Sequence, residues 1–170
     1  MQHVLGADVC GIFAPAGTFF HDYYMDVEPI QGMIPRLKRL LRQHSAKLVI
    51  ITHEWNERYR QRRIEWLKAK VFPHFGLTEK DVKICETREQ KRQACEEAGV
   101  TILLEDRLQV AQFVQGLPTL QRTYVLKPKQ RDVDQFSGVL SDASVQVFQS
   151  LKQLFHALFA YLRALQSQPA

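Results

Sequence analysis

The sequence of 170 residues contains few cysteines, and their spacing excludes two kinds of structure. Cys10, Cys85 and Cys95 are odd in number and far apart, so a disulfide framework is not expected. No Cys-x-x-Cys pair is present, so the cysteines give no sign of a zinc site. Free cysteines of this kind are typical of a reducing compartment, and we expect a cytoplasmic protein.

Long apolar segments are absent as well. No run of about 20 apolar residues occurs that could cross a bilayer, and the first residues lack the basic and apolar regions of a secretory signal. Internal repeats and low-complexity tracts are also missing. We therefore expect neither export nor a membrane partner, and the length suits one domain with a sizeable core.

The chain lacks a strong excess of one charge. Its net charge is +5 and its pI about 9.2, with 45% hydrophobic and 24% charged residues, as in ordinary globular proteins. The most basic stretch, residues 56–70, is expected to be a helix with a solvated basic face. Binding of a polyanion such as nucleic acid through this helix is the alternative.

Three apolar runs of the sequence end abruptly in polar side chains. They are residues 3–8, 47–52 and 100–106, which end in Asp8, in Thr52 and in the pair Glu105 and Asp106. Short apolar runs of this kind predict strands that are buried on both faces of a parallel sheet. The polar ends add nothing to a core, but the carboxyl ends of parallel strands meet at one rim where ligands bind. The sequence therefore predicts one site at that rim.

Strand and helix patterns alternate along the whole chain. Further strands are predicted at 81–85 and 122–126, and helices at 33–44, 56–70, 87–98 and 107–115. This alternation predicts an α/β fold, a three-layer, Rossmann-like parallel sheet covered by helices on both faces. Residues 14–29 are expected to form a loop whose aromatic side chains pack it down or line a substrate entrance.

The end of the chain is expected to stand apart from an α/β domain that covers residues 1–130. A connecting segment, 131–142, leads to an amphipathic helix at 143–166. Between Val147 and Leu165 the apolar residues recur at the alternating spacing of three and four that marks a heptad seam. The helix is expected either to pack on its own domain or to form a homodimer through residues 147–165.

The residue types at the rim suit phosphoryl transfer. A carboxylate can attack phosphorus and form an aspartyl-phosphate. Such a step needs a cation, and Mg²⁺ prefers a few carboxylates together with substrate oxygens. It also needs a hydroxyl and a lysine on the transferring oxygens. Asp8, Thr52, Glu105 and Asp106 would supply all of these except the lysine.

Four segments, in order, resemble the motifs of the haloacid dehalogenase (HAD) superfamily. Residues 8–13, Asp-Val-Cys-Gly-Ile-Phe, resemble the first motif, whose usual form is Asp-x-Asp-Gly-Thr/Val. Residues 48–56 resemble the second motif, Lys91 is similar in placement to the lysine of the third, and residues 102–106 resemble the acidic fourth. The resemblance covers roughly residues 3–127.

The resemblance implies a role for each matching residue. Asp8 would be the nucleophile and a Mg²⁺ ligand, with the backbone carbonyl of Cys10 as a second ligand. Asp106, helped by Glu105, would complete the acidic set. The phosphoryl oxygens of a phosphorylated substrate would be held by Thr52 and Lys91, with Lys80, Lys83 and Arg88 as substitutes for Lys91, and His53 would be a rim residue near the substrate. The gaps after Gly11 and after the second motif are too short for a large cap domain, so the chain resembles a capless or minimally capped member.

The first motif departs from the usual pattern at Cys10, where phosphatases of the superfamily have a second Asp. That Asp is a general acid and base, and a thiol, with an unperturbed pKa of ~8.5, replaces it poorly. Losing such a group costs ~10²–10⁴-fold in rate. Two hypotheses follow: a Mg²⁺-dependent phosphoester hydrolase of reduced or altered activity, or a catalytically silent HAD-fold protein that binds a partner or self-associates through its C-terminal helix.

Each rim residue also has a purely structural interpretation. Asp8 would cap a turn, and Thr52 would cap the helix that starts near Asn56. The pair Glu105 and Asp106 would complement the dipole of the next helix. Lys91 would be a solvated surface lysine.

Overall fold

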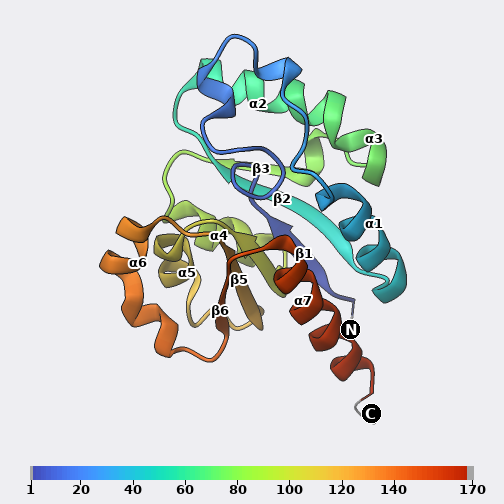
Figure 1. The fold of residues 1–170 in the computed structure, drawn as a ribbon, viewed down its shortest axis with the longest axis vertical. Coiled ribbons are helices and arrows are strands. Elements are labelled where there is room, and N and C mark those ends of the chain that lie inside the picture. Colours follow the sequence, from blue (N-terminus) through green and yellow to red (C-terminus); the bar gives the residue numbers. More distant parts are fainter. Residues whose placement is uncertain (1, 168–170) are drawn as a thin grey trace.

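The computed structural model describes residues 2–167, which form a six-stranded parallel sheet covered by helices on both faces (Figure 1). Its strands are β1 (Val4–Ala7), β2 (Lys47–His53), β3 (Val82–Cys85), β4 (Ile102–Glu105), β5 (Arg122–Leu126) and β6 (Val145–Phe148). They lie in the order β3-β2-β1-β4-β5-β6, and every neighbouring pair is parallel. The predicted α/β fold with a three-layer, Rossmann-like sheet is confirmed.

The strand order reverses once, between β1 and β4. The chain moves outward from β1 to β3, returns to the centre of the sheet, and moves outward again from β4 to β6. In doubly wound sheets ligands bind beside such a reversal, outside the carboxyl ends of the strands. The residues that follow β1 and β4 are therefore the best placed to form a site.

The helices cover the sheet in two groups. Those that share a core with one face are α1 (Met33–His44), α2 (Glu57–Lys70), α3 (Phe72–Phe75) and α7 (Leu151–Gln166). Those on the opposite face are α4 (Gln90–Glu97), α5 (Leu108–Val114) and α6 (Gln130–Phe136). Short 3₁₀ turns are η1 (Thr18–Phe20), η2 (Tyr24–Asp26), η3 (Glu79–Asp81) and η4 (Ser137–Ser141). Among the described residues, no helix has both the length and the apolar character needed to cross a membrane.

The sequence explains which face the long helices bury and where they begin. In α1 the side chains of Met33, Leu37 and Leu40 recur along one helical face, and all three are fully buried. The helix α2 begins after Asn56, whose side chain accepts a hydrogen bond from the backbone N–H of Tyr59. Because Asn56 is the cap, the alternative that Thr52 caps this helix is wrong.

The C-terminal helix begins later than predicted. Residues 145–148 form β6, which pairs with β5, so a helix from 143 or 147 is wrong. Two strand residues, Val147 and Phe148, continue the apolar spacing of the helix by coincidence, while Ser150 supplies the actual cap. The connecting segment also contains α6 and η4.

The apolar face of α7 is covered by the protein's own domain. Leu154, Phe155, Leu158 and Leu162 are almost fully buried and belong to the same core cluster as α1. Packing on the domain, one of the two interpretations of this helix, therefore accounts for these four side chains. Homodimerisation through residues 147–165 stays a prediction.

The segment between β1 and α1 folds down onto α2. Phe19 is buried and packs edge-on against Trp66, whose Nε1 donates a hydrogen bond to the carbonyl of Val27 at 2.8 Å. Phe20 and Tyr23, in contrast, stay largely exposed. Packing the loop down is therefore confirmed for Phe19, whereas a substrate entrance lined by aromatic residues of this segment stays a prediction.

Candidate active site

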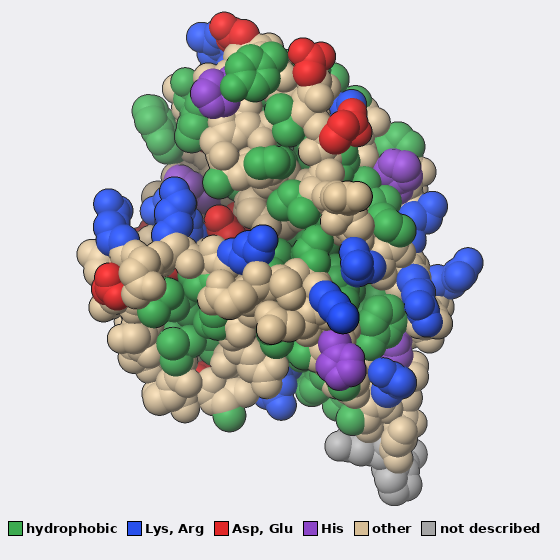
Figure 2. All heavy atoms as spheres, in the orientation of Figure 1, with side chains coloured by type: hydrophobic (Ala, Val, Ile, Leu, Met, Phe, Trp, Pro, Cys, Tyr) green, Lys and Arg blue, Asp and Glu red, His purple; other side chains and the backbone are tan. Residues whose placement is uncertain are grey.

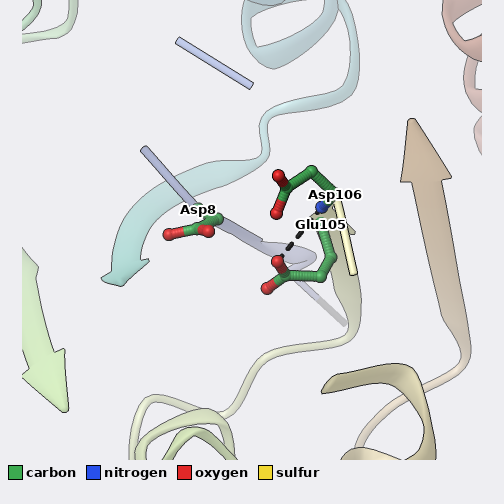
Figure 3. Close-up of side chains that lie close together, drawn as sticks. All are labelled: Asp8, Glu105 and Asp106. Carbon is green, nitrogen blue, oxygen red and sulfur yellow. Dashed lines mark hydrogen bonds between the residues drawn. The ribbon is translucent and has the colours of Figure 1, made fainter. Parts of the chain in front are cut away.

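Three carboxylates meet where β1 and β4 end (Figure 3). Asp8 follows β1, Glu105 ends β4, and Asp106 comes next. One ligand oxygen of each lies within 4.8 Å of those of the other two. The backbone N–H of Asp8 donates to the carbonyl of Leu104 at 3.0 Å, so the two strand ends are fixed side by side. The acidic cluster predicted at the rim is therefore present.

Lys91 connects two of these carboxylates from beneath. It is the second residue of α4, and its side chain is only 1% exposed. Its Nζ lies 2.7 Å from Oε2 of Glu105 and 3.2 Å from Oδ2 of Asp8. The alternative of a solvated surface lysine is wrong. Lys80 and Lys83, considered as substitutes, are exposed, whereas Arg88 lines the same cavity as Lys91.

Lys91 and Asp8 keep opposite charges despite their burial. Burial by itself would lower the pKa of Lys91, but the carboxylates of Asp8 and Glu105 outweigh this and raise the pKa. Burial would raise the pKa of Asp8, but Lys91 and Arg63 outweigh it, helped by a hydrogen bond from Thr52, and the pKa is lowered. Asp8 is therefore an ionised carboxylate at neutral pH, as a nucleophile must be.

Glu105 and Asp106 are shifted in the other direction. Burial raises the pKa of Glu105 well above its usual value, against the attraction of Lys91, and the neighbouring Asp8 and Asp106 raise it further. Burial and the charge of Asp8 raise the pKa of Asp106 as well. The positive charge around the three neighbouring carboxyl groups is therefore too small for all three to be ionised at the same time. A divalent cation with a preference for oxygen fits this set, because it would supply the missing charge.

Gly11 allows the loop after β1 to approach Asp106. Its φ is +80°, and a Cβ atom built on it would lie 2.5 Å from Cβ of Asp106. Its backbone N–H donates to the carbonyl of Ala14 at 2.7 Å, which closes the loop tightly. A side chain here would push the first and fourth motifs apart, so the acidic cluster depends on glycine at this position.

Thr52 lies behind the site and does not line its cavity. The side chain is fully buried at the end of β2, and its Oγ1 accepts a hydrogen bond from Nη1 of Arg63. Arg63 also forms a buried ion pair with Glu54, with Nη2 at 3.1 Å from Oε2. Thr52 therefore contacts the cavity through residues that line it, Arg63 and Asp8.

Arg63 and Glu54 were not among the predicted site residues. From the sequence, Arg63 is only one of the basic residues of the predicted helix 56–70. Tyr59, Arg63 and Trp66, however, follow the spacing of one helical face. A charged residue in the buried row of a helix is the signal that could have identified it. Glu54 carries no comparable signal, because its partner lies nine residues away on another element.

Cys10 and His53 are both uncharged at neutral pH. Burial raises the pKa of the Cys10 thiol to about 11, against the nearby charge of Arg63. Burial, followed by the charge of Arg88, lowers the pKa of His53, whose Nε2 lies 3.1 Å from the carbonyl oxygen of Glu86. Both side chains line the cavity above the carboxylates. Neither is a carboxylate that could replace the missing Asp of the first motif.

A cavity of about 530 Å³ opens above the carboxylates. Its floor contains Asp8, Cys10, Lys91, Glu105 and Asp106. Its wall and mouth add side chains that are mostly aromatic or basic, namely Phe20, His53, Glu54, Trp55, Tyr59, Arg63, Arg88, Arg107 and Lys129. Cavities of this volume commonly hold small molecules. The sequence-predicted residues thus converge on one cavity, with Thr52 just behind it.

The basic residues of α2 are mostly used within the protein. Arg62 donates to the carbonyls of Phe19 and His21 at 3.1 Å each, and Lys70 pairs with Glu28 at 2.5 Å. On the face shown in Figure 2, Lys and Arg side chains lie over α1 and α7 and also at the left, beside α6. The expected solvated basic face on α2 is therefore reduced by these internal pairs, and so is the basis for polyanion binding there.

No protein-family model matches the sequence, and no curated protein is similar to it in sequence. The structure is similar to the crystal structure of a protein from Burkholderia xenovorans LB400 described as a haloacid dehalogenase-like hydrolase. The match covers 95% of this chain and 98% of the other, with a TM-score of 0.64 and 11% sequence identity. A likeness at this identity concerns the fold and leaves the activity open. The chain therefore has the haloacid dehalogenase-like fold that its four motifs predict.

Proposed function

We propose that this protein is a Mg²⁺-dependent hydrolase of phosphorylated substrates that acts through Asp8. The observation that supports this is the ion-paired cluster of Asp8, Lys91 and Glu105, with distances of 2.7 and 3.2 Å. A buried lysine and ionised carboxylate directly beneath a cavity are costly to maintain for structure alone, since buried ion pairs contribute little net stability. Perturbed ionisable groups of this kind are characteristic of functional sites.

The proposed mechanism assigns the steps to side chains of the site. Asp8, Glu105, Asp106 and the backbone carbonyl of Cys10 would hold Mg²⁺, which supplies charge compensation for the phosphoryl group. An oxygen of Asp8 attacks phosphorus, the bond from phosphorus to the leaving oxygen breaks, and Lys91 stabilises the charge on the phosphoryl oxygens. Water then attacks phosphorus and releases phosphate and the free Asp8 carboxylate.

Cys10 sets the expected limit on the rate. A thiol whose pKa is about 11 neither protonates an alkoxide efficiently nor accepts a proton from water near pH 7. We expect turnover ~10²–10⁴-fold below that of a site with a carboxylate at this position. The short segment over the site, residues 8–32, leaves the cavity open, in keeping with the capless or minimally capped arrangement.

The test compares hydrolysis of p-nitrophenyl phosphate with Mg²⁺ and with a chelator. Turnover is expected for the wild type with Mg²⁺ and is expected to be lost in Asp8→Asn. The matched control is Asp26→Asn, an exposed aspartate on η2 outside the cavity. Turnover that persists in Asp8→Asn would contradict the proposed function.

The second candidate is a catalytically silent HAD-fold protein that binds a partner, and Cys10 favours it. An inert wild type together with a Cys10→Asp variant that gains activity dependent on Asp8 would support it. Self-association is tested by the mass of the full chain in solution. A chain that ends near residue 142 is unsuitable, because it would lack β6 and the buried face of α7.

A further inference from the structure

Exposed aromatic side chains gather at the mouth of the cavity. Trp55 is 72% exposed and Phe20 62% exposed, and both line the cavity above Asp8. Phe20 is held edge-on against Tyr59, with ring centroids 5.1 Å apart. Exposed aromatic side chains at the opening of a polar cavity are suited to stack on a flat ring of a ligand.

Cations surround the same mouth. Arg88, Arg107 and Lys129 line it, and no acidic side chain of the described residues lies within ion-pairing distance of Arg88 or Lys129. Within residues 2–167, the side chain of Arg88 donates only to the neutral amide oxygen of Gln109, at 3.3 Å. One phosphoryl group over Asp8 and Lys91 would leave Arg88 and Lys129 without an anionic partner, whereas Arg107 lies 3.8 Å from Asp106. The substrate is therefore expected to carry further negative charge beyond the phosphoryl group that is transferred.

Because a cysteine, Cys10, stands where a general acid is expected, the site favours a leaving group that needs no proton. An alcohol group would leave as an alkoxide, and the pKa of its conjugate acid is near that of water, about 15.7. Such a leaving group requires a general acid. A phosphate leaves easily as an anion, because its second pKa is ~6. Arg63 lines the same cavity as Cys10, and among the described residues its buried Nε–H has no hydrogen-bond acceptor. The site thus offers an N–H donor of a guanidinium group, paired on its other side with Glu54, where a proton donor is missing.

Together these features point to one substrate class, and we propose that the site hydrolyses the terminal phosphoanhydride bond of a nucleoside di- or triphosphate. This inference rests on the proposed function of Asp8. The base stacks on Trp55 and Phe20, and the leaving phosphate contacts the rim cations. The Asp8 carboxylate attacks the terminal phosphorus, and the bridging oxygen departs with the bonding electrons as a phosphate anion. Water then attacks the aspartyl-phosphate, which restores the carboxylate and releases phosphate and one proton.

Binding is tested first, with ADP and Mg²⁺ and with the Asp8→Asn variant so that turnover does not interfere. The chain has two tryptophans, and Trp66 is fully buried, so quenching of fluorescence reports on Trp55. By calorimetry, Trp55→Leu is expected to weaken ADP binding about 5- to 100-fold, the range of a lost base stack. Tyr23→Leu, also an exposed aromatic but outside the cavity lining, is expected to leave the affinity unchanged.

Measurements of hydrolysis distinguish a failure of the nucleotide inference from a failure of the proposed function. In the active protein, Trp55→Leu is expected to lower kcat/KM for ADP by a similar factor, and to lower it more than kcat/KM for pyrophosphate, which has no base to stack. Hydrolysis of acetyl phosphate that needs Asp8, without binding or hydrolysis of ADP, would overturn the nucleotide inference and keep the proposed function. Binding of ADP that depends on Trp55, without hydrolysis of any of these compounds, would overturn the proposed function and support only the nucleotide subsite.

Discussion

Replacing Lys91 with Met tests whether the acidic cluster depends on its buried cation. Lys91 is 1% exposed and pairs with Asp8 and Glu105, which are also buried. Methionine fills a similar volume but leaves the two carboxyl groups without their cation. Removing one partner of a buried ion pair costs about 3–5 kcal/mol. For a chain of this length we expect the Tm to fall by about 10 °C at pH 7.5.

The loss should depend on pH, and its direction follows from the pKa shifts. Lys91 lowers the pKa of Asp8, so this carboxylate contributes stability above its unfolded pKa, and that contribution disappears as the pH falls through the folded pKa. Without Lys91, the pKa values of Asp8 and Glu105 rise, and both groups become protonated at mildly acidic pH. The difference in the free energy of unfolding between wild type and Lys91→Met should therefore shrink from pH 7.5 to pH 5.

Urea unfolding, followed by the fluorescence of buried Trp66, measures both quantities. Lys80→Met is the matched control, because Lys80 is exposed and such surface changes stay within about 0.5 kcal/mol. The double variant Lys91→Met with Glu105→Leu should recover part of the loss, since it removes one unpaired carboxyl group. A loss below about 1 kcal/mol at pH 7.5, or one that is the same at pH 5, would refute the reasoning.

Three further perturbations probe the site. Gly11→Ala should destabilise more than Gly99→Ala, because both glycines have positive φ but only at Gly11 would the new Cβ meet Asp106; thermal unfolding of both variants checks this. Millimolar Mg²⁺ should raise the Tm of the wild type and not that of Asp106→Asn, as expected for a ligand that binds only the folded state, and an equal effect on both proteins would contradict the metal site. Iodoacetamide should modify Cys10 slowly at pH 7.5 and faster toward pH 10, because its pKa of about 11 leaves little thiolate near neutrality; peptide mass spectrometry measures the rate, and fast labelling at pH 7.5 would contradict the raised pKa.

The residues at the rim could be predicted because each follows from a local pattern. An apolar run that ends in Asp8 or in Asp106 identifies a strand and its carboxyl end, and parallel pairing brings such ends together without knowledge of the packing. Lys91 could be placed from its position in the next helix. That it is buried beneath both carboxylates depends on how α4 packs on the sheet, which the sequence pattern does not show.

The wrong prediction at β6 and the omission of Arg63 arise from tertiary contacts that local sequence patterns do not show. The predicted C-terminal helix extends over β6 because Val147 and Phe148 fit the spacing of a helix as well as that of a strand. Short apolar segments are ambiguous in this way, and the pairing of Val145 with Thr123 is a tertiary contact that decides the outcome. Arg63 was missed for a related reason, since its partners Thr52 and Glu54 become apparent only when α2 lies against β2.

The packing of α7 has a consequence for synthesis of the chain. Leu154 and Leu158 share a core cluster with Met33 and Leu37, so the apolar face of α1 is covered only after α7 has been synthesised. At about 5–20 residues per second, the roughly 100 residues between the two helices take ~5–20 s to translate. During that interval the apolar face of α1 is uncovered on the ribosome. The nascent chain is therefore expected to depend on chaperones until α7 emerges.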